Sequence, residues 1–252
     1  MTSLTLIETL KTKDWEYDDT PHLFKSGVDP HGLVTWKDIE YCLNNPNQFN
    51  IKFINKHINQ FIEYPKFKRA WDAHDQPEVR ELMNIFADGH TCIIEKFEYI
   101  HHSKQYILKQ IEDIFNVQAS MHIFCGLGDT RSFNIHEDYA NNLIIQVEGE
   151  THWEVYENRA SHLIPQLDYT SVADNLGQGV DPSKLTIAID HVMQPGDILY
   201  IPARTYHRAF PKAKRLSLSI PLQHLCSAQP CLLYTSDAAD EGLGVDLGGR
   251  RI

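Results

Sequence analysis

The sequence predicts a mostly β fold with α-helices near the N-terminus: a double-stranded β-helix of the jelly-roll type, with the helices packed on one outer face. Three observations support this prediction. Residues 118–221 contain short apolar runs separated by turn residues, residues 1–117 mix such runs with helical patterns, and no internal repeat interrupts either part. We expect a single domain over residues 1–230, with an α/β part at 1–117 and the β-helix core at 118–221.

Helical patterns occur mainly before residue 118. Thr35 is a capping residue in front of a run whose apolar side chains fall near one face over residues 35–43. Residues 77–87 begin with proline at a first-turn position, and residues 99–115 are amphipathic. We therefore expect two or three helices in these ranges, together with one strand at residues 91–95.

The later part of the chain has the pattern of closely spaced antiparallel strands joined by glycine-containing turns. Such a series after an α-rich start predicts a jelly-roll or cupin barrel. The segment NNLIIQVEGETHWEVY is expected to form a hairpin that turns at Glu148 and Gly149. The expected strand segments are SMHIFCGL, SFNIHED, NNLIIQVEGETHWEVY, LTIAIDHVMQPGDILYIP and RLSLSIPL.

Composition excludes several classes of protein. The chain of 252 residues has 34 acidic and 23 basic side chains, and its net charge of −11 argues against a general nucleic-acid coat protein. The start of the chain lacks a signal-peptide pattern, and no apolar run approaches the ~20 residues of a membrane span. The 5 cysteines are scattered and indicate neither a disulfide framework nor a zinc knuckle. We expect a cytoplasmic protein without a membrane partner; its oligomeric state stays open, and an oligomer is compatible with the sequence.

The end of the chain differs in character from the rest. Residues 231–241 (CLLYTSDAADE) and 245–252 (VDLGGRRI) closely resemble translated read-through of sequencing-library adapters. Neither segment shows a sustained period of 2 or 3.6 residues. We expect the native sequence to stop near Pro230 and residues 231–252 to be a non-native tail; the alternative is a real flexible tail, and in neither case has it a role in chemistry.

Two histidines and one aspartate are candidate metal ligands. His136 and Asp138 are two residues apart in a strand-like segment, so both side chains point to one face and can hold one ion. His152 and Glu154 have the same spacing, but the parity of their hairpin strand predicts that they lie outside the barrel. His207 follows a turn, a buried strand and a short loop, and is the natural third ligand. Two imidazoles and a carboxylate fill one face of octahedral Fe(II) and leave three positions open; the alternative is that these histidines only cap strands or form hydrogen bonds in the core.

At these segments the chain resembles the JmjC and cupin-like branch of the Fe(II)/2-oxoglutarate oxygenases. This family includes ribosomal-protein hydroxylases, an asparaginyl hydroxylase and a tRNA wybutosine hydroxylase. The resemblance covers roughly residues 118–221, and the three segments in this order are much more specific than any one of them. They are His136-Glu137-Asp138, the hairpin strand from Asn142 to Gly149 with Trp153 after it, and PGDILYIPARTYH from Pro195 to His207.

The resemblance implies a site and a reaction. His136, Asp138 and His207 would be the iron ligands, and Asn142 would help to hold the cosubstrate 2-oxoglutarate, which binds iron through its 1-carboxylate and 2-oxo oxygens. The implied enzyme is an Fe(II)- and 2-oxoglutarate-dependent dioxygenase that uses O2, produces succinate and CO2, and hydroxylates its substrate. Because Asp138 fills the position that halogenating relatives leave open for chloride, hydroxylation is favoured over halogenation.

One position departs from the family pattern. The family usually has lysine or arginine two residues after the hairpin glycine, where it pairs with the distal carboxylate of 2-oxoglutarate, but this chain has Thr151 there. A buried dianion needs a cation or several strong donors. Arg215 is the expected substitute because it shares a strand face with Ser217 and Ser219, and a guanidinium can hold a carboxylate through two hydrogen bonds. The alternative is that Arg215 is a surface charge and Thr151 a hydroxyl donor or simple filler.

Two other functions stay open at this point. One is a cupin enzyme that uses its metal without 2-oxoglutarate, such as an isomerase or a direct dioxygenase. The other is a metal-holding cupin module without catalytic activity, which the threonine at position 151 keeps in consideration. The primary substrate is also open, since a protein side chain, a small metabolite or a tRNA base would fit, and so is the choice between hydroxylation, desaturation and demethylation.

Overall fold

The computed structural model describes residues 5–15, 20–58, 60–68, 76–130, 133–159 and 182–223. The segment 231–252, which we expect to be non-native, lies outside the described residues. The helices are α1 (Leu6–Leu10), α2 (Trp36–Asn44), α3 (Val79–Ala87) and α4 (His102–Phe115), with 3₁₀ helices η1 (Phe97–Ile100) and η2 (Pro182–Lys184). The strands are β1 (His22–Phe24), β2 (Asn50–Ile54), β3 (Lys66–Phe67), β4 (Gln76–Pro77), β5 (Thr91–Glu95), β6 (Gln118–Ala119), β7 (His122–Gly126), β8 (Asn141–Glu148), β9 (Thr151–Arg159), β10 (Ile187–Met193), β11 (Ile198–Ile201), β12 (Thr205–Pro211) and β13 (Arg215–Gln223).

The helix predictions are confirmed with two differences. α3 begins only at Val79, so Pro77, expected in its first turn, belongs to β4 instead. α2 begins after Thr35, whose hydroxyl accepts a hydrogen bond from the backbone N–H of Asp38 while the Asp38 carboxylate accepts one from the Thr35 N–H. The helix expected at residues 99–115 is divided, because η1 precedes α4 and the chain is extended at His101 between them. The predicted strand at residues 91–95 is β5.

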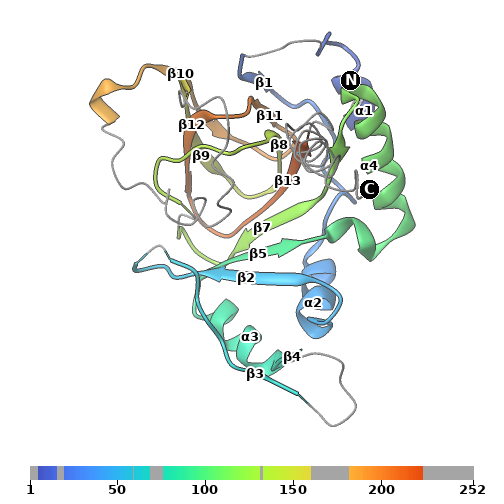
Figure 1. The fold of residues 1–252 in the computed structure, drawn as a ribbon, viewed down its shortest axis with the longest axis vertical. Coiled ribbons are helices and arrows are strands. Elements are labelled where there is room, and N and C mark those ends of the chain that lie inside the picture. The colour runs from blue at the N-terminus through green and yellow to red at the C-terminus, as the bar shows by residue number, and fades with distance from the viewer. Residues whose placement is uncertain are drawn as a thin grey trace, which may run out of the picture.

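Two antiparallel sheets form the core of the fold, as the predicted fold class requires. The larger sheet has the order β1-β11-β8-β13-β7-β5-β2, with β6 paired to β13, and the smaller sheet has the order β10-β9-β12 (Figure 1). Three strands of the larger sheet, β1, β2 and β5, come from the part of the chain before residue 118. The N-terminal part therefore extends the sheet of the β core as well as supplying helices.

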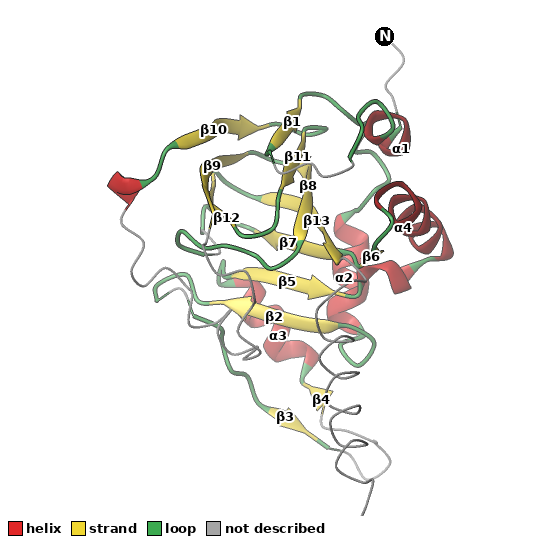
Figure 2. Cartoon of the chain, turned by 45° about the horizontal axis from the view of Figure 1, so that its top comes forward, coloured by secondary structure: helices red, strands yellow, loops and turns green. Residues whose placement is uncertain are grey.

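Apolar side chains fill the two faces of the larger sheet differently. On β13, Leu216, Leu218 and Ile220 are buried in one cluster with residues of α2 and α4 such as Ile39 and Ile111. This face is covered by helices, and Figure 2 shows α1 and α4 along one side of the molecule with β9, β10 and β12 on the opposite side. The second apolar cluster draws on both sheets and thus lies between them; it consists of Ile144, Val155, Met193, Leu199 and Ile201.

Two glycines lie in turns where the backbone of another segment approaches closely. Gly149, between β8 and β9, has a φ of +73°, and a Cβ added there would lie 2.1 Å from the carbonyl oxygen of Lys214. The hairpin can therefore approach the start of β13 only with glycine at this position. Gly196 has a φ of +94° in the turn before β11, where a Cβ would lie 2.6 Å from the carbonyl oxygen of Val28. Among the described residues, no helix combines the length and the apolar character needed to cross a membrane.

Candidate functional site

The three predicted metal ligands lie together in the structure. One ligand-type atom from each of His136, Asp138 and His207 lies within 4.8 Å of the other two. The ring centroids of the two histidines are 4.3 Å apart, and Nε2 of His207 is 3.6 Å from Oδ2 of Asp138. His207 belongs to β12, whereas the segment that carries the other two forms only a single bridge at His136 instead of the expected strand. The side chains converge on one point from segments about 70 residues apart.

Backbone contacts hold the two imidazoles in register. The N–H of His136 donates to the carbonyl of His207 at 3.1 Å, and the N–H of His207 donates back at 2.9 Å. The Nδ1 atom of His136 lies 2.8 Å from the carbonyl of Asn134, and that of His207 lies 2.9 Å from the carbonyl of Thr205. Because a carbonyl can only accept, each Nδ1 carries the proton and each Nε2 has a free lone pair for a metal ion.

The donor set fits a divalent non-haem iron. Two imidazoles and one carboxylate on one face, with open positions opposite, are the ligand set of non-haem Fe(II) oxygenases. His207 is buried, and the loss of solvation, together with the neighbouring His136, lowers the pKa of His207. Its imidazole is therefore neutral at neutral pH, which is the form that binds a metal ion.

An ion pair beside the ligands was not foreseen from the sequence. Arg204 has its Nε 2.8 Å from Oε2 of Glu137, and both side chains are largely buried. The N–H of Arg204 also donates to the carbonyl of Asp138 at 2.7 Å, and its guanidinium lies 5.3 Å from the ring centroid of Tyr139. Arg204 has a φ of +67°, a conformation that non-glycine residues rarely adopt. These contacts join the loop before His207 to the segment that carries the other two ligands.

We expect loss of this ion pair to weaken metal binding by about tenfold without removing a ligand, because partners that orient ligands contribute about 10- to 100-fold to metal affinity. The informative variants are Glu137→Gln and Arg204→Gly, since glycine keeps the left-handed backbone of residue 204 while deleting the guanidinium. Calorimetric titration with Co²⁺ measures the affinity. Wild-type affinity in both variants would show that the ion pair does not position the ligands.

A cavity of about 90 Å³ adjoins the three ligands. This volume can hold several water molecules or a small diacid, since one water needs about 10–15 Å³ measured in the same way. The structure places all the predicted cosubstrate-binding residues in its lining. They are Asn142, Thr151, Arg215 and Ser217, and Ser219 lines the cavity as well.

Arg215 is a buried cation at this cavity, with a relative exposure of 3%. Its Nη2 donates to Oγ1 of Thr91 at 3.0 Å, and its Nη1 donates to the carbonyl of Thr130 at 3.2 Å. Burial lowers the pKa of Arg215 to about 10, so the group stays protonated at neutral pH. The structure thus rules out the alternative that Arg215 is a surface charge.

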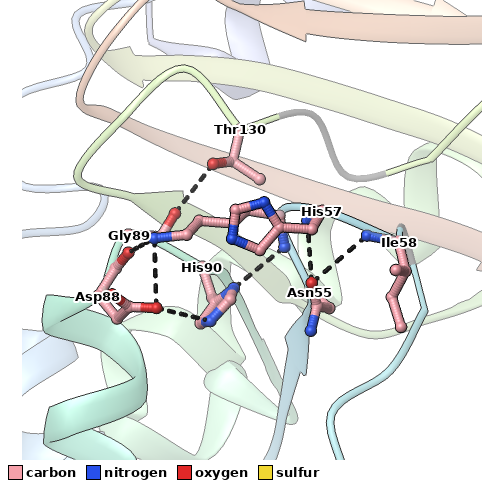
Figure 3. Close-up of polar contacts among 8 residues, drawn as sticks. Asn55, His57, Ile58, Asp88, Gly89, His90 and Thr130 are labelled. Carbon is pink, nitrogen blue, oxygen red and sulfur yellow. Dashed lines mark hydrogen bonds and ion pairs between the residues drawn. The ribbon is translucent and has the colours of Figure 1, made fainter.

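Thr130, one of the described residues that accept a hydrogen bond from Arg215, is itself held in place by a cluster of polar contacts around the buried His90. Figure 3 shows the hydroxyl of Thr130 donating to the carbonyl of Gly89 at 3.0 Å. The turn at Gly89 is held by its neighbours: Nε2 of His90 lies 3.0 Å from Oδ2 of Asp88, and Nδ1 of His90 accepts from the N–H of Lys56 at 3.0 Å. The contacts of Thr130 with Gly89 and of Lys56 with His90 join residues 41 and 34 positions apart, so no local sequence pattern could have indicated them.

The remaining polar residues of the cavity form short hydrogen-bonded links. Ser217 donates to Oε1 of Gln146 at 3.1 Å, and Ser219 donates to Oδ1 of Asn142 at 2.9 Å. The amide of Asn142 lies 3.5 Å from Oδ2 of Asp138. Asn142 therefore connects the serine face of β13 with the carboxylate of the candidate metal site.

Two buried polar atoms at the cavity indicate that it takes a polar ligand. Oγ1 of Thr151 and Nε1 of Trp153 have no hydrogen-bond partner within the described part of the chain. A buried polar group left in this state costs about 1–3 kcal/mol. Such a cost is understandable where a bound molecule supplies the missing partner.

The competing pair lies on the opposite face of β9, as strand parity predicts. His152 is paired with Asp190 at 2.6 Å, and Glu154 is paired with Arg208 at 2.6 Å. Neither His152 nor Glu154 lines the cavity. These contacts give both residues a structural explanation that needs no metal ion.

Comparisons with known proteins agree with this geometry. A sequence model described as JmjC domain matches residues 93–229. The chain is 26% identical over 208 residues to the bifunctional lysine-specific demethylase and histidyl-hydroxylase NO66 of Brugia malayi, covering 73% of this chain and 28% of that protein. It is also 26% identical over 168 residues to the protein of the same name from Drosophila melanogaster, covering 64% of this chain and 24% of that protein.

Solved structures share the fold. Escherichia coli ycfD matches with a TM-score of 0.62 and 17% identity, over 100% of this chain and 60% of that chain. The same ribosomal oxygenase in complex with cobalt and 2-oxoglutarate matches with a TM-score of 0.58 and 16% identity, over 97% of this chain and 58% of that chain. The chain thus spans less than two thirds of the length of each of these relatives.

Proposed function

We propose that this chain, which belongs to the JmjC domain family, is an Fe(II)- and 2-oxoglutarate-dependent oxygenase that hydroxylates its substrate. The observation that carries the proposal is the position of His136, Asp138 and His207, with ligand-type atoms within 4.8 Å of one another beside a cavity that contains the buried Arg215. The NO66 proteins are named as hydroxylases, and ycfD has been solved with cobalt and with 2-oxoglutarate, which supports the proposal.

Each of the predicted site residues has a task in this reaction. His136, Asp138 and His207 hold Fe(II) through two neutral imidazoles and one carboxylate. Arg215 binds the distal carboxylate of 2-oxoglutarate, and the hydroxyl of Ser217 turns from Oε1 of Gln146 to donate to the same carboxylate when it is bound. Thr151 donates its hydroxyl, which has no partner among the described residues, to the same cosubstrate, and Asn142 orients Asp138 and the cosubstrate.

Bound together, iron and 2-oxoglutarate supply the activation of O2, with succinate and CO2 as products and one oxygen atom transferred to the substrate. The chain supplies position and a dry environment. His136, Asp138 and His207 would supply three of the metal's ligands, and the remaining positions would be available to the cosubstrate and O2. The apolar cluster between the two sheets, with Ile144 shared between cluster and cavity, limits the access of water.

We propose a protein side chain as the primary substrate. The relatives named above are a lysine-specific demethylase with histidyl-hydroxylase activity and a ribosomal oxygenase, and both names denote action on macromolecules. We place the enzyme in the cytoplasm, in keeping with the buried, unpaired thiols of Cys42, Cys92 and Cys125 among the described residues.

Succinate release tests the proposed function directly. The protein loaded with Fe(II) is given O2, 2-oxoglutarate and, in separate reactions, histidine- and lysine-containing peptides, nucleosides or free amino acids. We expect iron-dependent succinate formation that rises with one class of peptide and is absent from Zn²⁺-loaded protein. Failure of the Fe(II)-loaded protein to bind 2-oxoglutarate would overturn the proposal, and turnover without 2-oxoglutarate would favour a different cupin enzyme.

A further inference from the structure

Trp153 carries a buried hydrogen-bond donor at the cavity. Its ring lines the cavity together with the metal ligands, and its centroid lies 6.0 Å from that of His207. The Nε1 atom is buried and lacks an acceptor among the residues that the structure describes. By contrast, the indole N–H of Trp15, in the helical part of the molecule, donates to the carbonyl of Leu10 at 2.7 Å.

The strand register places Trp153 between the two ends of the cavity. Gly149, just before β9, lies against the backbone of Arg215, where an added Cβ would be 3.1 Å from Cα. Val155, two residues after Trp153, lies opposite His207 in β12. Since side chains two residues apart share a face and strands rise about 3.3 Å per residue, Trp153 stands between the cation and the metal ligands.

The chemistry of the indole restricts what it can contact. An indole N–H donates and never accepts, so it contributes nothing to binding a metal ion and needs an oxygen acceptor. Within the chain, Oδ1 of Asn142 already accepts from Ser219, and Ser217 donates to Gln146. A ligand that spans the cavity from Arg215 to the metal would pass Trp153 and could offer carboxylate and keto oxygens.

We infer that Trp153 is a cosubstrate-binding residue, whose indole N–H donates a hydrogen bond to an oxygen at the 2-oxo acid end of 2-oxoglutarate. This inference rests on the proposed function. A hydrogen bond to a charged acceptor is stronger than one between neutral groups. Removal of this donor should therefore weaken cosubstrate binding by about tenfold, whereas the metal affinity should stay the same because no ligand is altered.

The test uses protein labelled with ¹⁵N at the indoles and loaded with Zn²⁺, a d¹⁰ ion without redox activity. The Trp153→Phe variant identifies the Trp153 signal, and the signal of Trp15 serves as an internal reference. We expect 2-oxoglutarate to shift the Trp153 signal and slow its exchange with solvent while the Trp15 signal stays in place. Calorimetry with Co²⁺-loaded protein should give a dissociation constant for 2-oxoglutarate about tenfold higher in Trp153→Phe.

The possible failures can be told apart. If metal-loaded wild-type protein does not bind 2-oxoglutarate at all, the proposed function fails and the inference fails with it. If 2-oxoglutarate binds but leaves the Trp153 signal and the affinity of Trp153→Phe unchanged, only the inference is overturned. It is likewise overturned if Zn²⁺ alone moves the signal to its final position, since the indole would then respond to the metal site and not to the cosubstrate.

Discussion

Replacement of His207 by alanine is expected to abolish succinate formation and to weaken metal binding by more than about 100-fold. Partners that only orient ligands contribute about 10- to 100-fold, so deletion of one of three ligands should exceed that range. His207 is the ligand held most firmly, with 3% exposure, two backbone hydrogen bonds to His136 and one from its ring to Thr205. Calorimetric titration with Mn²⁺ or Co²⁺ and a succinate assay give the two measurements.

The matched control is His152→Ala. This histidine also belongs to the smaller sheet, but it lies on the other face of β9 and pairs with Asp190. We expect the loss of the His152 side chain to leave metal affinity and turnover at wild-type values, because exposed ion pairs contribute little to stability. Thermal unfolding of both metal-free variants shows whether each is folded. Retention of metal affinity in His207→Ala, or its loss in His152→Ala, would mean that the metal site has been placed on the wrong face of the strand.

Local spacing explains why several site residues could be selected from the sequence. His136 and Asp138 were selected by their two-residue spacing, although the structure forms only a bridge at His136 where a strand was expected. Alternation along a strand is also a local property, so the position of Trp153 in its hairpin could be read directly. The same rule separated His152 and Glu154 from the cavity, and it put Arg215 and the serines of β13 on one face. The predicted helices were found for a similar reason, because capping residues and amphipathic spacing are local signals.

Features that depend on distant contacts could not be predicted in this way. The addition of β1, β2 and β5 to the larger sheet depends on pairings such as that of Cys92 with Cys125, which no local period encodes. The ion pair of Arg204 with Glu137 joins residues 67 positions apart, so no local pattern indicated it. Thr91, which accepts from the guanidinium of Arg215, is 124 positions away from it. Local patterns therefore indicated the candidate ligands, but not what holds them in position.

Replacement of Arg215 by alanine is expected to raise the dissociation constant of 2-oxoglutarate by about 100-fold or more. The guanidinium is buried at the cavity, and truncation of one partner of a buried, hydrogen-bonded charge pair costs about 2–5 kcal/mol, with about 1.4 kcal/mol per tenfold change. Metal affinity should be retained because no ligand changes. Calorimetry with Co²⁺-loaded protein measures both constants.

Two further variants separate loss of charge from loss of structure. Arg215 also donates to Thr91 and Thr130, so the alanine variant will lose some stability, and its fold is checked by thermal unfolding. Arg215→Lys keeps a charge but loses the two-pronged geometry, and we expect intermediate affinity. The double variant Thr151→Lys, Arg215→Ala moves the cation to the position where relatives of this family usually carry it.

Rescue by the double variant would give the strongest support for the site. Thr151 is buried, lines the same cavity and has an unpartnered hydroxyl among the described residues, so a lysine there can direct its ammonium group to the distal carboxylate. Recovery of 2-oxoglutarate binding would show that the cavity needs one cation and that either strand can supply it. Unchanged affinity in Arg215→Ala would instead remove the cosubstrate role of Arg215, and a metal-dependent cupin reaction without 2-oxoglutarate would become the better explanation of the site.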